Sequence, residues 1–123
     1  MQAKGRSPVL IRSPNPNARV RLFCFPYAGG GTATYRDWTA WLPADIEIAA
    51  VQLPGREWRI QEPLIEDMRE LAADAYAAIQ PFLDKPFALL GTSMGGMLIY
   101  EVARRLREEG QPLPICLLPF ACG

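Results

Sequence analysis

The sequence contains no histidine among its 123 residues. Imidazole is the side chain that most often serves as a general base at neutral pH, and it is the commonest metal ligand. Cysteine is also scarce, and Cys24, Cys116 and Cys122 are spaced too widely for a disulfide framework or a metal site. The sequence therefore predicts no metal and no cofactor. It also predicts a reducing, cytoplasmic location, with Cys24 as a small buried hydrophobe.

An excess of charge of one sign is missing as well. Thirteen Lys and Arg residues balance thirteen Asp and Glu residues, whereas a nucleic-acid-binding domain carries a basic surplus. No apolar run reaches the length of about 18 residues that a transmembrane helix needs. Residues 1–19 lack the apolar core of a signal peptide. These absences predict a protein that binds neither nucleic acid nor membrane.

Apolar residues are plentiful and fall into short alternating runs. They make up half of the sequence, which is enough for the core of one domain. Residues 1–18 are expected to form an N-terminal segment with a short strand, and residues 19–123 the domain itself. Extended runs and helical periodicity predict strands at 9–11, 20–25, 46–53, 87–90 and 113–118, and helices at 35–42, 65–83 and 96–109. Such alternation predicts an α/β fold with a mostly parallel sheet and helices on both faces.

The segment Gly91-Thr92-Ser93-Met94-Gly95 joins a predicted strand to a predicted helix. A G-x-S-x-G sequence in that context is typical of a nucleophile elbow, in which a tight turn presents the serine hydroxyl above the sheet. The glycines allow strand and helix to approach without a Cβ clash. The alternative is a glycine-rich turn that carries an inert serine. The context favours Ser93 as a catalytic nucleophile.

The loop after the strand at 20–25 reads Pro-Tyr-Ala-Gly-Gly-Gly and lies at the same edge of the predicted sheet as Ser93. Acyl transfer needs two N–H donors for the tetrahedral oxyanion. One is expected from Met94, and the other from the Tyr27–Gly30 loop. A plain flexible loop is the alternative. A P-loop is excluded, because the Lys-Ser/Thr ending is missing.

Three blocks of sequence resemble the type II thioesterases that accompany nonribosomal peptide and polyketide synthases, within the α/β-hydrolase fold. The blocks are RLFCFPYAGGGTATYRDW at 21–38, AVQLPGREWRIQEP at 50–63 and PFALLGTSMGGMLIYEVARRL at 86–106. The resemblance implies hydrolysis of acyl thioesters from the phosphopantetheine arm of acyl or peptidyl carrier proteins. It implies a Ser–Asp–His triad with Ser93 as nucleophile, and an oxyanion hole formed by the amides of Ala28 and Met94.

The sequence departs from the family in three places. Thr92 stands where these enzymes commonly have histidine, and the family pattern fades after Pro114. The sequence ends after the strand that follows the elbow helix, so it is expected to be a truncated α/β-hydrolase fold that lacks the triad aspartate and histidine. None of its aspartates matches a triad position. Two alternatives therefore stay open: an inactive remnant or carrier-protein-binding module, and another serine ester hydrolase.

Weaker candidates lie in the loops at the same edge. Tyr27 and Gly29 are candidates for substrate or carrier contact, as are Arg56 and Arg59, which suit an acidic carrier protein or its phosphate. Solvated surface arginines are the alternative. Trp38, Trp41 and Trp58 are candidates for an acyl pocket or for core packing. Glu57 and Glu62 are titratable, but nothing in their spacing indicates a general base.

Overall fold

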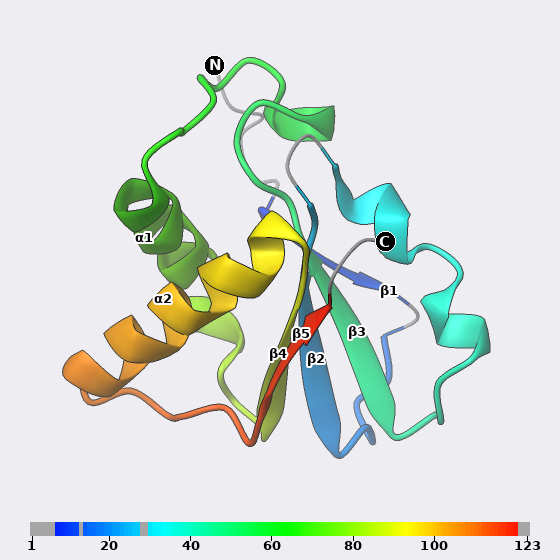
Figure 1. Cartoon of the computed structure of the whole chain (residues 1–123). Coiled ribbons are helices and arrows are strands. Elements are labelled where there is room, and N and C mark those ends of the chain that lie inside the picture. Colours follow the sequence, from blue (N-terminus) through cyan, green and yellow to red (C-terminus); the bar gives the residue numbers. More distant parts are fainter. Residues whose placement is uncertain (1–6, 13, 28–29, 121–123) are drawn as a thin grey trace.

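The computed structural model describes residues 7–12, 14–27 and 30–120 of the chain. The sheet has five strands in the order β1-β3-β2-β4-β5 (Figure 1). Its strands are β1 (Val9–Arg12), β2 (Val20–Phe25), β3 (Ile46–Val51), β4 (Phe87–Thr92) and β5 (Leu117–Phe120). Two α-helices, α1 (Met68–Ile79) and α2 (Met94–Glu108), alternate with the strands, and short 3-10 helices lie at η1 (Thr32–Tyr35), η2 (Trp38–Ala40), η3 (Glu57–Arg59) and η4 (Gln80–Phe82).

Strand pairing follows the order expected from the sequence. Strand β2 pairs in parallel with β3 and β4, and β4 pairs in parallel with β5. Among the strands of the described residues, only β1 runs antiparallel, with Val9 opposite Val51 of β3. The predicted mostly parallel α/β sheet is therefore confirmed. The last strand begins at Leu117 rather than at 113, because Pro112 and Pro114 have no N–H to donate to a neighbouring strand.

The two faces of the sheet are covered differently. Phe23, Phe25 and Leu89 lie in the core against which α1 and α2 pack (Figure 1). Residues that alternate with these along the strands, such as Cys24 and Leu90, point to the other face of the sheet. There they belong to a smaller core with Tyr35. Strands β2, β3 and β4 are buried on both faces, which explains their near-continuous apolar runs. Burial raises the pKa of the Cys24 thiol, as suits an inert core residue. Cys122 lies outside the described residues.

Two helix predictions need correction. The helix expected at 35–42 is replaced by the 3-10 helices η1 and η2. The segment is short and ends before Pro43, which leaves too few residues for a stable α-helix. The helix expected at 65–83 covers only Met68–Ile79. Asp67 starts it by accepting the N–H of Arg69 at 2.8 Å, and Pro81 lies in η4 directly after it.

Acidic groups at the opposite end of the sheet from Ser93 have a structural role. Arg21 is buried in β2 and binds Glu47 at 2.8 Å and Asp84 at 2.6 Å. Burial opposes the ionisation of Glu47, but hydrogen bonds from the Asn15 N–H and from Arg21 outweigh it and lower the pKa of Glu47. Asp84 precedes β4, whereas Ser93 follows it. This placement agrees with the exclusion of Asp84 as a triad member.

Strand β5 leaves an apolar edge uncovered among the described residues. Ile115 is 61% exposed and Met97, on the adjoining helix α2, is 65% exposed. Leu118 and Phe120 are exposed on β5 itself. An open apolar edge of this kind is a template for strand pairing.

We expect the purified chain to self-associate, to be partly unfolded or to be insoluble. Light scattering coupled to gel filtration would measure its mass at several concentrations. Leu118→Lys should reduce self-association, because a charge on an edge strand opposes pairing with another chain. A clean monomer with one sharp calorimetric transition would contradict this expectation.

No helix in the described part of the chain is both long and apolar enough to span a membrane.

Candidate active site

Ser93 occupies the turn between β4 and α2 with a backbone conformation that L-residues rarely adopt. Its φ and ψ angles are 57° and −115°, and a non-glycine residue with positive φ is uncommon. The residue is exposed, although the strand before it and the first turn of the helix after it are largely buried. Strained residues of this kind cluster at active sites, where the surroundings hold them in place. The geometry is that of the predicted nucleophile elbow.

The glycines of the motif are required by backbone contacts. A Cβ added at Gly91 would lie 2.0 Å from the carbonyl oxygen of Gly95. One added at Gly95 would lie 2.5 Å from the carbonyl oxygen of Phe25. Both obstacles are backbone atoms, which cannot move aside as a flexible side chain would. Strand β4, the end of β2 and the start of α2 therefore meet at a separation that only glycine permits.

Hydrogen bonds from neighbouring elements fix the elbow. The Ser93 N–H donates to the Phe120 carbonyl of β5 at 2.7 Å. The buried Tyr35 hydroxyl lies 2.7 Å from the Phe25 carbonyl, to which it donates, and 2.8 Å from Oγ1 of Thr92. Tyr35 thus links the end of β2 to Thr92, the residue before Ser93. Sequence analysis missed this role, because a tyrosine in a predicted helix gives no sign of a partner 57 positions away.

The predicted oxyanion donors are only partly placed. Met94 is the first residue of α2, where backbone N–H groups have no intrahelical partner and the helix dipole is positive. In the glycine-rich loop the Gly30 N–H donates to the Tyr27 carbonyl at 2.8 Å, and the Tyr27 side chain is 42% exposed. Ala28 and Gly29 lie outside the described residues, so their assignments stay predictions.

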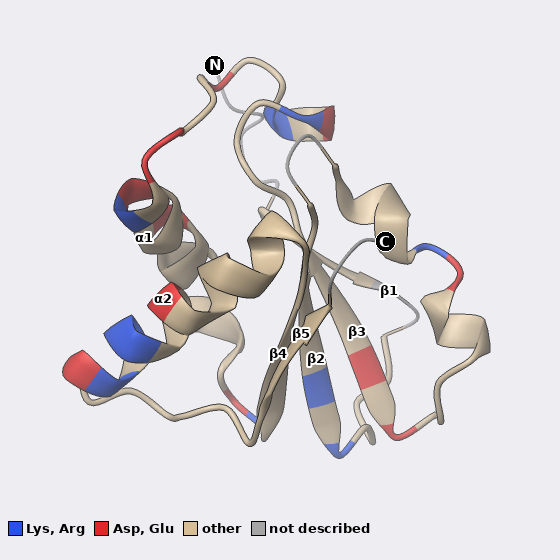
Figure 2. Ribbon diagram, viewed as in Figure 1, with Lys and Arg blue, Asp and Glu red and all other residues tan. Residues whose placement is uncertain are grey.

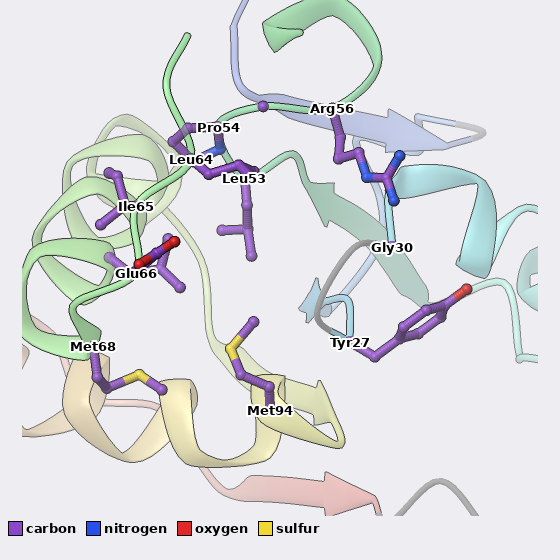
Figure 3. Close-up of a pocket in the computed structure, with 12 residues that line it drawn as sticks. Tyr27, Gly30, Leu53, Pro54, Arg56, Leu64, Ile65, Glu66, Met68 and Met94 are labelled. Carbon is purple, nitrogen blue, oxygen red and sulfur yellow. The ribbon is translucent and has the colours of Figure 1, made fainter.

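An apolar cavity of about 480 Å³ opens beside Met94. Figure 3 shows the Met94 and Leu53 side chains pointing toward one another across it. Ile65, Met68 and Leu71 extend the apolar lining. The remaining lining residues are Tyr27, Gly30, Pro54, Gly55, Arg56, Leu64 and Glu66. A volume of this size is within the range of small-molecule sites.

The tryptophans do not form this cavity. Trp38 packs edge-on against Tyr35, with ring centroids 5.1 Å apart, and Trp41 is 74% exposed. The Trp58 indole N–H donates to the Ser7 carbonyl at 3.1 Å. Of the two alternatives for these residues, core packing or partial exposure fits their positions and an acyl pocket does not.

Arg59 is not the surface residue that the sequence predicts. Its side chain is only 5% exposed and lies 2.8 Å from both Glu62 and Asp74, and it donates to the Gln52 carbonyl at 2.7 Å. Burial opposes the charge on Arg59, but hydrogen bonds to Glu62 and Asp74 outweigh it and raise the pKa of the guanidinium. A group held in this way cannot bind a carrier protein. Arg56, in contrast, is exposed at the cavity, and its role in carrier contact stays a prediction.

Replacing Arg59 with methionine should lower the free energy of unfolding by about 3 kcal/mol at neutral pH, because it leaves two carboxylates unpaired. The loss should shrink in acid. The hydrogen bond from Arg59 lowers the pKa of Glu62, so its stabilisation is present above the unfolded pKa of about 4.3 and disappears as the pH falls through the folded pKa. Urea unfolding of both proteins at pH 7 and pH 3 measures this. An equal difference at both pH values would contradict it.

Neither Glu57 nor Glu62 has the setting of a catalytic base, as their spacing in the sequence suggested. Glu62 is paired with Arg59, and Glu57 accepts a hydrogen bond from the Thr32 hydroxyl at 2.7 Å. Figure 2 shows charged residues on η3, near the start of α1 and on the C-terminal half of α2, whereas the first turns of α2 carry none. The described residues include no group of three or more His, Cys, Asp and Glu side chains that could hold a metal ion.

Comparison with known proteins agrees with this geometry. The sequence profile of the thioesterase domain matches residues 20–117. The chain is 47% identical over 105 residues to the AMB antimetabolite synthetase AmbE of Pseudomonas aeruginosa, covering 85% of this chain and 5% of AmbE. It is 40% identical over 103 residues to the gramicidin S biosynthesis protein GrsT of Aneurinibacillus migulanus, covering 84% of this chain and 40% of GrsT.

A solved structure gives the same result in three dimensions. The RedJ thioesterase from the prodiginine biosynthetic pathway of Streptomyces coelicolor superposes with a TM-score of 0.79 at 40% identity, covering 83% of this chain and 39% of RedJ. The chain thus spans about two fifths of GrsT and RedJ and a far smaller part of AmbE. The α/β-hydrolase fold and the type II thioesterase resemblance predicted from the sequence are confirmed. With its elbow, sheet order and profile match in agreement, the chain belongs to the thioesterase domain family.

Proposed function

We propose that this chain supplies the nucleophile of a serine thioesterase that releases acyl groups from the phosphopantetheine arm of carrier proteins. The observation that carries the proposal is the exposed Ser93, which is held at positive φ directly before Met94, a residue that lines the apolar cavity. The relatives support the substrate class, because GrsT is named for gramicidin S biosynthesis and RedJ is a thioesterase of prodiginine biosynthesis.

In the proposed reaction the Ser93 Oγ attacks the thioester carbonyl, and the C–S bond breaks to give an acyl-serine and a free thiol. Water then hydrolyses the acyl-serine. The Met94 N–H and a glycine-loop N–H stabilise the oxyanion in both steps. We place the imidazole base and its aspartate partner outside these residues, because the sequence has no histidine.

The cavity beside Met94 suits the acyl group of this substrate. Its walls are formed by leucine, isoleucine and methionine side chains, and its charged residues are Arg56 and Glu66. An aliphatic chain would exchange water for these walls and gain roughly 0.8 kcal/mol for each buried methylene. The proposed substrate is therefore an aliphatic acyl thioester rather than a polar one.

Hydrolysis of acyl thioesters of increasing chain length tests the proposal, in a form of the protein extended to the length of its relatives. The value of kcat/KM should rise by up to about fourfold per methylene until the cavity is full. Ile65→Trp, which narrows the cavity, should move the optimum to shorter chains. Ile60→Trp is the control, because Ile60 is 63% exposed and does not line the cavity.

Matched substrates separate the remaining alternatives. A thioesterase should prefer an acyl-carrier thioester to the oxygen ester of the same acyl group, whereas an ester hydrolase should show the reverse preference. A carrier-protein-binding module is the second candidate, and the absence of histidine favours it. Such a module would bind the acylated carrier in a titration without releasing thiol.

A further inference from the structure

The segment that follows the glycine-rich loop is bound from the neighbouring loop after β3. Oε1 of Glu57 accepts a hydrogen bond from the Thr32 hydroxyl at 2.7 Å, and Oε2 accepts one from the Ala33 N–H at 3.3 Å. The buried Gln52 side chain accepts the Thr32 N–H at 3.3 Å. We call Glu57 and Gln52 the loop clamp. It binds the start of η1, where the chain leaves the glycine-rich loop.

Packing at Gly31 shows how closely the clamp approaches the backbone. A Cβ added at Gly31 would lie 2.1 Å from Oε2 of Glu57 and 3.2 Å from Oε1 of Gln52. Glycine at this position therefore lets the carboxylate reach the N–H and hydroxyl groups beyond it. Any other residue would push Glu57 away from the loop.

Glu57 also has an unusual backbone. Its φ angle is 46°. In the described part of the chain, Glu57 and Ser93 are the only non-glycine residues with a positive φ angle. A glutamate has no conformational preference for this region. Its neighbour Arg59 is anchored by two carboxylates, which helps to hold η3 in place. In this strained backbone conformation the Glu57 carboxylate reaches Thr32 and Ala33.

The other end of the glycine-rich loop is fixed by Tyr35. Its hydroxyl donates to the Phe25 carbonyl, the last residue of β2, and contacts Thr92 beside the nucleophile. Tyr35 itself belongs to η1, the helix that the clamp binds. The clamp, η1 and Tyr35 thus form a continuous link from the loop after β3 to the elbow.

We propose that Glu57 is a positioning residue, which holds Thr32 and Ala33, and through them the adjoining Gly31 end of the glycine-rich loop, in place for oxyanion binding. The proposal rests on the proposed function. It assigns Glu57 no proton transfer, because both carboxylate oxygens accept hydrogen bonds from the loop. In Glu57→Gln the amide oxygen can accept the Ala33 N–H, and the amide NH2 can donate to the Thr32 hydroxyl oxygen. Glu57→Gln should therefore preserve positioning, whereas a general base would be lost in that variant.

Amide hydrogen exchange of the chain tests the clamp without any need for turnover. Glu57→Ala should accelerate exchange at Ala33 by at least about tenfold, because the acceptor of the Ala33 N–H is removed. Glu57→Gln and the control Glu108→Ala, an exposed residue on α2, should leave it near the original rate. Exchange in β2 reports whether each variant is folded. Unchanged exchange at Ala33 in a folded Glu57→Ala protein would overturn the proposal.

Kinetics of the extended form test the consequence for catalysis. Glu57→Ala should lower kcat by about 10²-fold, the effect of misplacing a reacting group by about 1 Å, with KM changed by less than about threefold. Glu57→Gln should recover most of kcat. An unaffected kcat in Glu57→Ala, or no recovery in Glu57→Gln, would overturn the positioning role. If the extended form has no Ser93-dependent turnover, the proposed function fails, and hydrogen exchange still decides whether the clamp exists.

Discussion

The chain as given is expected to hydrolyse an acyl-pantetheine thioester at close to the background rate. Ser93 needs a base to accept its proton during attack, and water needs the same base during deacylation. Imidazole suits both steps, and the sequence has none. In a serine protease, loss of the catalytic serine or histidine alone costs about 10⁶ in turnover, and the remaining rate comes from the oxyanion hole and binding.

Thiol release should be followed for three proteins side by side. These are the chain as given, a form extended to the length of its relatives with their aspartate and histidine, and the Ser93→Ala variant of that form. The extended form should exceed the chain by several orders of magnitude, since a triad accounts for about 10⁶ in turnover. Ser93→Ala should remove that gain.

Two results would contradict this expectation in different ways. Turnover by the unextended chain that Ser93→Ala abolishes would show that these residues contain a base, and Glu57 and Glu62 would be examined first. An extended form without turnover would instead argue against the thioesterase proposal and favour a module that binds carrier protein.

Gly95→Ala should be among the most destabilising single substitutions in the chain. The new Cβ would lie 2.5 Å from the Phe25 carbonyl oxygen and 2.9 Å from that of Pro26. To relieve these contacts, α2 would have to move away from β2, which opens the core that both share. We expect a loss of at least about 3 kcal/mol, above the usual cost of overpacking because both obstacles are backbone atoms.

Gly110→Ala is the matched control for Gly95→Ala. Gly110 has a positive φ of 67°, but a Cβ there would meet nothing within 4 Å. Its substitution should cost only about 1 kcal/mol, from backbone conformation alone. Denaturant midpoints of both variants compare the two costs. Similar losses would show that conformation, and not the close approach at the elbow, determines the glycine requirement.

Local patterns in the sequence were sufficient to predict the sheet and the turn at Ser93. The runs at β2, β3 and β4 are nearly continuously apolar because both sheet faces are covered, and that pattern is visible without a structure. The elbow was predictable because its glycines and serine are adjacent in the chain. Helix boundaries were less accurate at 35–42 and 65–83, where Pro43 and Pro81 limit the helices more than apolar periodicity indicates.

The sequence by itself therefore determined the α/β class, the strand order through its family resemblance, and the sharp turn that carries Ser93. Only the tertiary structure decided which charged residues are available at the edge of the sheet. Arg56 and Arg59 are equivalent in the sequence, yet Arg59 is buried because Asp74 of α1 comes within 2.8 Å of it. The Tyr35–Thr92 contact and the Glu57 clamp likewise join segments distant in the chain. Contacts between such distant residues produce no periodic pattern in the sequence, because only folding brings the two partners together.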